Sequence, residues 1–254
     1  MTISFTFDNP IWKAGGSEQN LNVQDYTHKI SASGGFDSAT LNFPTKQAQT
    51  EDWFINGLGR HIIVYGQSLN IIWEGFVNEI SINVGVLSAK VGPLLEIANK
   101  VKVTHQTISY NTNPPVGGEQ AETAFANDTT SQSNYGILES IVSGGTGSTT
   151  EMEQIRDTYI EENRSPQNDR SLNIGSSPQN ATVTLSCMGY YHILDHYYYE
   201  NTGRNNSDVG TKIKDVIDGD PGSRFDTVNV SANSLVVNEY EKGDKTALAI
   251  FKGS

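Results

Sequence analysis

Cysteine and positive charge are both scarce in this chain of 254 residues. Its single cysteine, Cys187, has no second cysteine with which to form an intrachain disulfide, and no charged-then-apolar secretion signal opens the sequence. We therefore expect synthesis in the cytoplasm. No uninterrupted apolar run approaches the ~18 residues that a membrane-spanning helix needs, so we expect no integral membrane association.

Acidic residues outnumber basic ones by 29 to 17, which gives a net charge of −12. A surface of this sign repels the phosphates of nucleic acids within a Debye length, so the composition argues against a protein that grips DNA or RNA. The same repulsion would suit a passage through which DNA slides without specific binding. Solubility alone also explains the acidity, and that alternative stays open.

Charged residues make up only 18% of the chain, and Asn, Ser, Thr, Gly and Gln fill much of the remainder. This composition suits many short strands and turns better than a helical bundle, and it predicts a mainly β, or β-rich α+β, protein. Apolar periodicity is clear in residues 1–104, fades in 105–180 and returns in 181–254. We therefore expect two strand-built domains on either side of a polar insertion or arm with one short helix.

The clearest local pattern is a hairpin in residues 60–82. Two apolar runs flank the turn sequence of residues 66–70, as is typical of paired antiparallel strands. Trp73 is expected to lie against the core of the first domain, and Gly75 to allow a close backbone approach or a bulge. A short helix that starts at Pro93 and a strand through Val101 are expected to follow.

Two further helices have recognisable ends. The sequence from Thr150 matches a capping box, and apolar residues recur at helical spacing until Pro166 stops the helix. Ser207 can cap a second helix, which Gly219 ends. Between and beyond these helices the pattern predicts strands, including one that begins at Ala181.

Candidate chemical sites are weak. His192 and His196 stand four residues apart, as two metal ligands on a helix would, but the tyrosine-rich surroundings favour a strand and no third ligand has the usual spacing. Residues 218–222 begin like a calcium loop and lack its later glutamate, so a turn is the better interpretation. Cys187 follows an apolar run and is more typical of a small buried residue than of a nucleophile. We therefore predict no catalytic residue, no metal and no cofactor, and a protein that is not an enzyme.

Tyrosines cluster between residues 190 and 199. A tyrosine offers a broad rigid surface with a polar edge, which suits a domain core, a subunit interface or glycan stacking. We single out Tyr190, Tyr197 and Tyr198 as structural or interface residues, together with Trp73 and Gly75. Glycan binding stays open.

Several segments, in this order along the chain, resemble tail proteins of long-tailed bacteriophages, in particular the baseplate or tail-tip hub. They are residues 59–61, 71–80, 95–103, 189–194 and 212–217. The resemblance implies a homotrimer in which each protomer contributes two tube-like β-barrel domains. It also implies a ring in the virion tail that joins the tail tube to distal tail, tip or spike proteins and leaves DNA a passage.

Two other functions remain as alternatives to this structural hub. A distal tail or adhesin module that binds host glycans would display Tyr and Trp beside Asp and Asn. A tail-associated peptidoglycan hydrolase would need paired carboxylates or a metal triad, which the sequence does not reveal.

Overall fold

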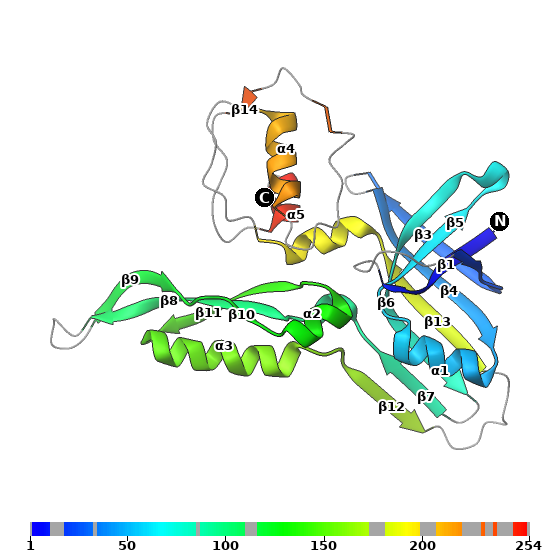
Figure 1. Ribbon diagram of the computed structural model, residues 1–254, viewed down its shortest axis with the longest axis horizontal. Coiled ribbons are helices and arrows are strands. Elements are labelled where there is room, and N and C mark those ends of the chain that lie inside the picture. Colours follow the sequence, from blue (N-terminus) through cyan, green and yellow to red (C-terminus); the bar gives the residue numbers. More distant parts are fainter. Residues whose placement is uncertain are drawn as a thin grey trace. The chain divides into compact units, whose positions relative to one another are not determined.

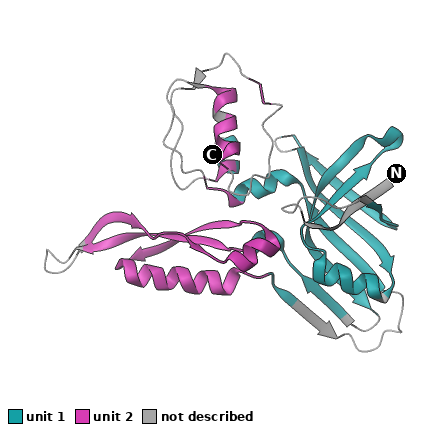
Figure 2. Ribbon diagram, in the orientation of Figure 1, with its two compact units in different colours: residues 1–96, 166–195, 248–254 teal, residues 97–165, 196–247 magenta. Residues whose placement is uncertain are grey.

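The computed structural model describes residues 2–10, 18–32, 35–84, 87–109, 116–172, 181–198, 207–219, 230–231, 236–237 and 246–252. Within them the protein is mainly β, and most paired strands run antiparallel (Figure 1). Two compact units make up the chain (Figure 2). The first unit comprises residues 1–96, 166–195 and 248–254, and the second comprises 97–165 and 196–247.

The first unit is built on a nine-stranded sheet, two strands of which branch from the main path. Its strands are β1 (Thr2–Pro10), β2 (Glu18–Asn20), β3 (Asp25–Ser31), β4 (Gly35–Thr45), β5 (Arg60–Tyr65), β6 (Ile71–Val84), β7 (Leu87–Val91), β12 (Asn168–Leu172) and β13 (Ala181–Met188). Its helical segments are α1 (Gln47–Asn56), η1 (Gln67–Leu69), η2 (Leu94–Glu96) and η3 (Tyr190–His196). The predicted β5–β6 hairpin is confirmed, with Val64 opposite Trp73.

The two ends of this sheet lie close together along the chain. The strand order β2-β1-β5-β6-β13-β4-β3 puts β2 and β3 at opposite ends of the path. Only residues 21–24 join them, and the five steps from Asn20 to Asp25 span at most about 18 Å. A flat sheet of seven strands would separate its outer members by about 29 Å. The sheet therefore curls until its ends approach each other, although hydrogen bonds close no barrel among the described strands.

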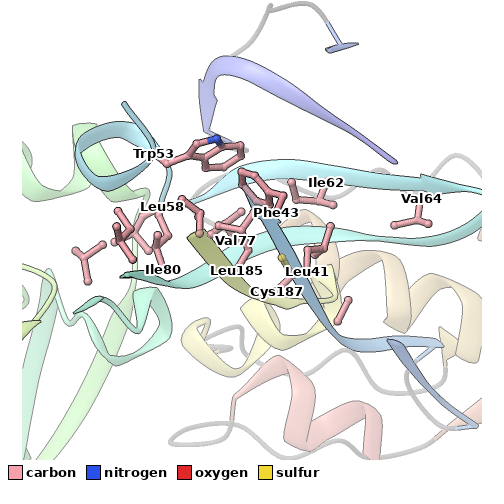
Figure 3. Packing of buried hydrophobic residues seen from close by; sticks show 14 of the residues in the cluster. Leu41, Phe43, Trp53, Leu58, Ile62, Val64, Val77, Ile80, Leu185 and Cys187 are labelled. Carbon is pink, nitrogen blue, oxygen red and sulfur yellow. The ribbon is translucent and has the colours of Figure 1, made fainter. Parts of the chain in front are cut away.

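The core of the first unit follows the two-residue period of its strands. In β4 the buried residues are Ala39, Leu41 and Phe43, while the residues between them are half-buried. The strand β13 alternates in the same way. Figure 3 draws its buried Leu185 and Cys187 together with Leu41 and Phe43 of β4. Trp53 of α1 meets the ring of Phe43 edge-on, with centroids 5.5 Å apart, so the helix covers part of this face. Each large apolar side chain buried here contributes about 1.5–3 kcal/mol.

Arg60, at the start of β5, is fully buried beside this core. Its Nη2 lies 2.9 Å from Asp52 Oδ2, and its guanidinium carbon lies 4.7 Å from the centre of the Trp53 ring. A buried cation is tolerated only with a matched anion or aromatic face. Arg60 therefore ties α1 to the sheet.

The second unit has a four-stranded sheet of its own with β8 at its centre. Its elements are β8 (Lys100–Ser109), β9 (Val116–Glu122), β10 (Ala126–Asn127), α2 (Thr129–Tyr135), β11 (Glu139–Thr146), α3 (Thr149–Asn163), β14 (Ser207–Asp208), α4 (Val209–Asp218) and β15 (Val236–Val237). The strand β11 runs parallel to β8, and α3 packs against both. In the remaining helix, α5 (Ala247–Lys252), the first residue is assigned to the second unit and the others to the first.

This division differs from the predicted segments 1–104, 105–180 and 181–254. The strand at Ala181 does not open a second domain, because β13 inserts between β4 and β6 in the first sheet. The polar region is also not an arm of loops with one helix, because it holds β9, β10, β11, α2 and α3. Its strands are rich in Ser, Thr, Gly and Gln, so they form ladders without the alternating apolar signal.

Two local expectations were shifted by one or two residues, and a third was wrong. The helix expected from Thr150 is α3, but its capping box begins at Ser148, whose Oγ accepts from the Glu151 N–H. Asp208 caps α4 in place of Ser207. Residues 190–196 form a 3₁₀ helix where a strand was expected. Gly189 precedes this helix, and a Cβ there would stand 1.6 Å from the Phe36 carbonyl oxygen, so only glycine fits at this position.

Candidate functional site

Two of the predicted structural residues, Trp73 and Gly75, lie on β6. Trp73 is fully buried in the core cluster of the first unit. At Gly75 a Cβ would lie 2.2 Å from the carbonyl oxygen of Met188, so β13 passes too close for any side chain. The β6–β13 register also shifts at Cys187, as in a bulge. The close backbone approach expected at Gly75 is thus present.

The predicted Tyr190 packs within the first unit. Its ring lies 5.5 Å from that of His61 and 6.0 Å from that of Phe76, centre to centre. His61 Nε2 in turn lies 2.8 Å from Glu74 Oε1. Burial, and then the charge of Glu74, raises the pKa of Tyr190 above its ordinary value. Tyr190 therefore anchors η3 to the β5–β6 hairpin as a neutral, half-buried side chain.

A second polar anchor of η3 centres on Asp37 of β4. Its carboxylate accepts a hydrogen bond from the Tyr191 hydroxyl at 2.6 Å, and its Oδ1 lies 3.0 Å from His192 Nε2. Lys29 Nζ of β3 lies 2.9 Å from the other carboxylate oxygen. The hydrogen bond from Tyr191, and then that from Lys29, holds the pKa of Asp37 well below its usual range.

This Asp37 cluster holds η3 against β4 and β3. It is not suited to proton transfer near neutral pH. Burial and the hydrogen bond to Asp37 raise the pKa of Tyr191 to about 12, so the phenol stays protonated while the carboxylate stays charged. The nearby Cys187 is buried, and burial raises its thiol pKa. We identify no activated nucleophile among the described residues of this region.

The other two predicted tyrosines belong to the second unit. Tyr197 is 5% exposed, and its carbonyl accepts a hydrogen bond from the Ala247 N–H at 2.8 Å. The Tyr198 N–H donates to Glu139 Oε2 at 2.9 Å, and Tyr198 bridges to Thr246. These residues fasten separate stretches of the second unit to one another.

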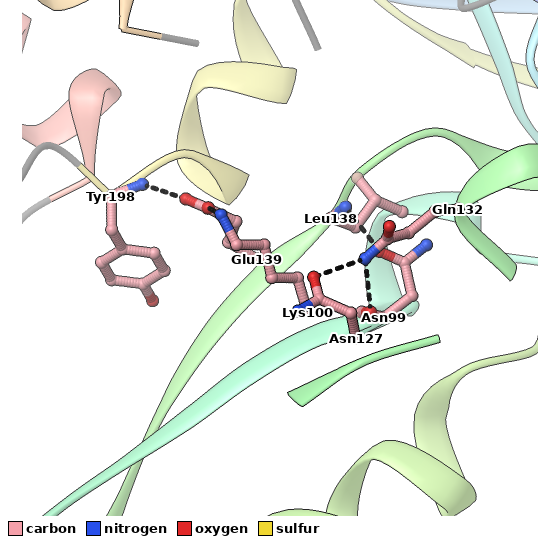
Figure 4. A network of polar contacts seen from close by, with 7 residues as sticks. All are labelled: Asn99, Lys100, Asn127, Gln132, Leu138, Glu139 and Tyr198. Atoms are coloured by element: carbon pink, nitrogen blue, oxygen red, sulfur yellow. Dashed lines mark hydrogen bonds and ion pairs between the residues drawn. The ribbon is translucent and has the colours of Figure 1, made fainter. Parts of the chain in front are cut away.

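Asn99 is the centre of a buried polar network in the second unit (Figure 4). Its amide donates to the Ser131 hydroxyl at 3.2 Å and to the Gly136 carbonyl at 2.7 Å, while its Oδ1 accepts from the Leu138 N–H at 2.8 Å. The Gln132 amide donates to the backbone carbonyl of Asn99. One side chain thus fixes α2 and both ends of the connection to β11.

Two lysines of β8 are held by carboxylates and by one aromatic ring. Lys100 pairs with the buried Glu139, and Lys102 Nζ lies 3.0 Å from Glu122 Oε2. Both ammonium groups lie over the ring of Phe125, at 4.5 and 5.1 Å from its centre. The positive charges of this strand are therefore neutralised internally.

We find no group of three or more His, Cys, Asp or Glu in the described residues that could hold a metal ion. His192 instead faces Asp37, and residues 220–222 of the suspected calcium loop lie outside the described part. In that part no helix is long and apolar enough to cross a membrane.

Comparisons with family models, with curated proteins and with solved structures found no match to this chain.

Exposed large apolar side chains occur at several places in the described part, among them Ile30 of β3 and Ile55 of α1. At two further places a groove or a strained turn accompanies the exposed side chain. Along α3 a shallow groove of about 460 Å³ is lined by Glu151, Gln154, Ile155, Thr158, Tyr159 and Glu162. Ile155 is 41% exposed within this acidic setting.

The second surface is the tip of the β5–β6 hairpin, where Leu69 is 75% and Ile71 is 46% exposed. Ser68 and Leu69 have φ values of 64° and 60°, a region that costs residues other than glycine about 1–2 kcal/mol each. Sequence reasoning identified this turn but missed its tip. The signal was a leucine inside an otherwise polar turn sequence.

Proposed function

We propose that this protein is a structural component of a bacteriophage tail, a baseplate or tail-tip hub. In this role several copies, expected to be three, form a ring that joins the tail tube to the tip and gives DNA a passage. The protein would act by shape and assembly and would carry no catalytic centre.

The curled sheet of the first unit is the observation that carries this proposal. A ring wall made of tube-like units needs sheets that bend back on themselves, and residues 21–24 hold β2 and β3 within about 18 Å of each other. Leu21 and Val23 of this short connection pack against the core cluster, so the curl is fixed by apolar contacts. A flat open sheet would not support the same role.

The pattern of charge also suits a passage for DNA. Cationic side chains in the described part are repeatedly matched with carboxylates, which leaves little free positive surface for a phosphate backbone. The pairs are Lys29–Asp37, Arg60–Asp52, Lys90–Glu79, Lys100–Glu139, Lys102–Glu122, Arg156–Asp157 and Arg164–Asp128. With a net charge of −12, the lumen of a ring would repel DNA and let it slide.

Neither alternative function gains a supporting observation. A glycan-binding module needs exposed aromatic rings, whereas Tyr190 packs on His61 and Phe76 and Tyr197 is buried. A hydrolase of the expected kind needs paired carboxylates or a metal triad, and the described residues hold no group of three or more His, Cys, Asp or Glu that could bind a metal ion.

Electron microscopy of the purified chain, combined with native mass spectrometry, tests the proposal. We expect ring-shaped particles with three-fold symmetry, a central passage and a negative inner wall. A chain that stays monomeric at every concentration would contradict the hub function, as would an assembly without a passage. A ring with a basic inner wall would contradict the proposed sliding of DNA.

A further inference from the structure

The tip of the β5–β6 hairpin combines exposed apolar side chains with a strained backbone. Leu69 exposes 75% of its surface, and both Ser68 and Leu69 adopt the left-handed backbone region that favours Gly and Asn. Neither feature helps the isolated chain to fold. A single exposed leucine is ordinary on a protein surface. Here it stands beside the exposed Ile71 on a strained backbone, and that combination points to a contact outside the monomer.

The tip is held on a rigid stalk. The Gly66 N–H donates to the Asn70 carbonyl at 2.8 Å, which closes the turn, and antiparallel pairing continues from there into β5 and β6. A side chain on such a stalk keeps its position before it meets a partner. Little conformational entropy is then lost when the contact forms.

Charge indicates which partner can approach this tip. Residues 62–73 contain no Asp, Glu, Lys, Arg or His, although the chain as a whole carries a net charge of −12. Two copies of so acidic a chain repel each other wherever carboxylates face carboxylates. The exposed Ile155 lies in a groove between Glu151 and Glu162, so a second copy is disfavoured there. The uncharged tip can approach a second copy without this penalty.

We propose that Leu69 is the residue through which one copy of this chain docks on the next copy in the ring. This inference rests on the proposed function, because it names the surface by which the ring closes. Ring closure uses a heterologous contact, in which a projection on one subunit enters a different surface of its neighbour. A single projecting leucine on a fixed hairpin has the form that such a contact needs.

The test compares Leu69→Asn and Leu69→Gly with the wild-type chain. Both replacements tolerate the left-handed backbone and remove the apolar side chain. Ile55→Asn is the matched control, because Ile55 is also 75% exposed but lies in the ordinary helix α1. Sedimentation velocity over a dilution series measures self-association, and thermal unfolding of dilute monomer measures the fold.

We expect both Leu69 variants to weaken self-association by about tenfold or more, as truncation of a central interface residue does. Their monomers should melt at the same temperature as the wild type or higher, because the strain is relieved. Ile55→Asn should associate like the wild type.

Three results would overturn the inference. A wild-type chain that never associates would remove the ring and this contact together. A wild-type ring with unchanged association of the Leu69 variants would leave the hub function intact, assign the tip to another partner and overturn this inference alone. Loss of association only together with a lower melting temperature would assign Leu69 to the fold.

Discussion

The two units of this protein fill their interiors with different chemistry. The first unit buries a continuous cluster of aliphatic and aromatic side chains from β4, β5, β6, β13 and α1. The second unit has a smaller buried apolar group and, beside it, an unusual set of buried polar residues. These polar residues are Asn99, Lys102, His105, Thr123, Ser131 and Glu139. Apolar burial is non-directional and tolerates small shifts, whereas a buried polar group is stable only while its partners stay in place. The comparison predicts which substitutions each unit tolerates.

The largest effect is expected in the apolar interior. Trp73→Ala removes a fully buried side chain and should lower the free energy of unfolding by about 3–5 kcal/mol through the cavity that it leaves. Urea unfolding measures this loss, and assembly should fail with it. Val84→Ala on the same strand is the control, because Val84 is 42% exposed and should cost below about 0.5 kcal/mol. A Trp73→Ala variant that folded and assembled like the wild type would show that the apolar core does not depend on Trp73.

The second unit should respond most strongly at Asn99. Asn99→Leu keeps the volume roughly but leaves the Gly136 carbonyl and the Leu138 N–H without their buried partner. We expect a loss of about 2–4 kcal/mol, at about 1–2 kcal/mol for each of these two unpaired groups. Hydrogen exchange should rise in α2 and not in the first sheet.

Asn83→Leu supplies the matched control, because Asn83 is exposed on β6. If Asn99→Leu stabilised the protein instead, the polar interior of the second unit would be replaceable by apolar packing, as some buried polar sets are.

A smaller effect is expected for the ion pair between Lys100 and Glu139. A double-mutant cycle with Lys100→Met and Glu139→Gln should give a coupling energy of about 1–3 kcal/mol, because the Glu139 side chain is only 4% exposed. The pair Arg156–Asp157, whose carboxylate side chain is 62% exposed, should give below about 0.5 kcal/mol in the same cycle. Equal coupling in the two pairs would show that burial does not distinguish them.

The smallest effect concerns a polar anchor in the apolar unit, and it depends on pH. Asp37 has a lowered pKa in the folded protein, where Tyr191, His192 and Lys29 face it. Its contribution to stability is therefore complete above its unfolded pKa of about 4 and is lost as the pH falls toward the lower folded value. Asp37→Asn should destabilise the protein at pH 7, and the difference from wild type should shrink below pH ~4. A difference that stayed constant between pH 7 and pH 3 would contradict this.

Sequence patterns revealed the apolar unit better than the polar one. The strand through Leu41 follows the two-residue period, because one of its faces is buried. The hairpin at residues 60–82 was recognised from two apolar runs around a polar turn, and the middle of β6 is buried on both faces. In the polar region the strand β11 was missed, because Ser143 and Gly144 replace the apolar residues that mark a buried face. The helix α3 was found there only because capping and helical spacing do not depend on a fully apolar interior.

The contacts of the candidate site were harder to foresee. In the Asp37 cluster, Tyr191 and His192 lie more than 150 positions after Asp37 in the sequence. No local pattern encodes such a pairing. Gly75 was identified because a glycine inside a strand indicates close backbone approach. The discontinuous first unit could not be foreseen, because the strand at Ala181 has the same alternation whether it opens a new domain or completes an old one.

The position of β13 also sets the order in which parts of this chain can fold during translation. This strand separates β4 from β6, so both neighbours have open backbone edges until residue 188 has left the ribosome. The segment from β8 to α3 is contiguous and can fold earlier, while the first sheet waits with edges that favour aggregation. A nascent chain arrested before Ala181 should therefore protect residues 97–165 from limited proteolysis and leave residues 1–96 open to cleavage.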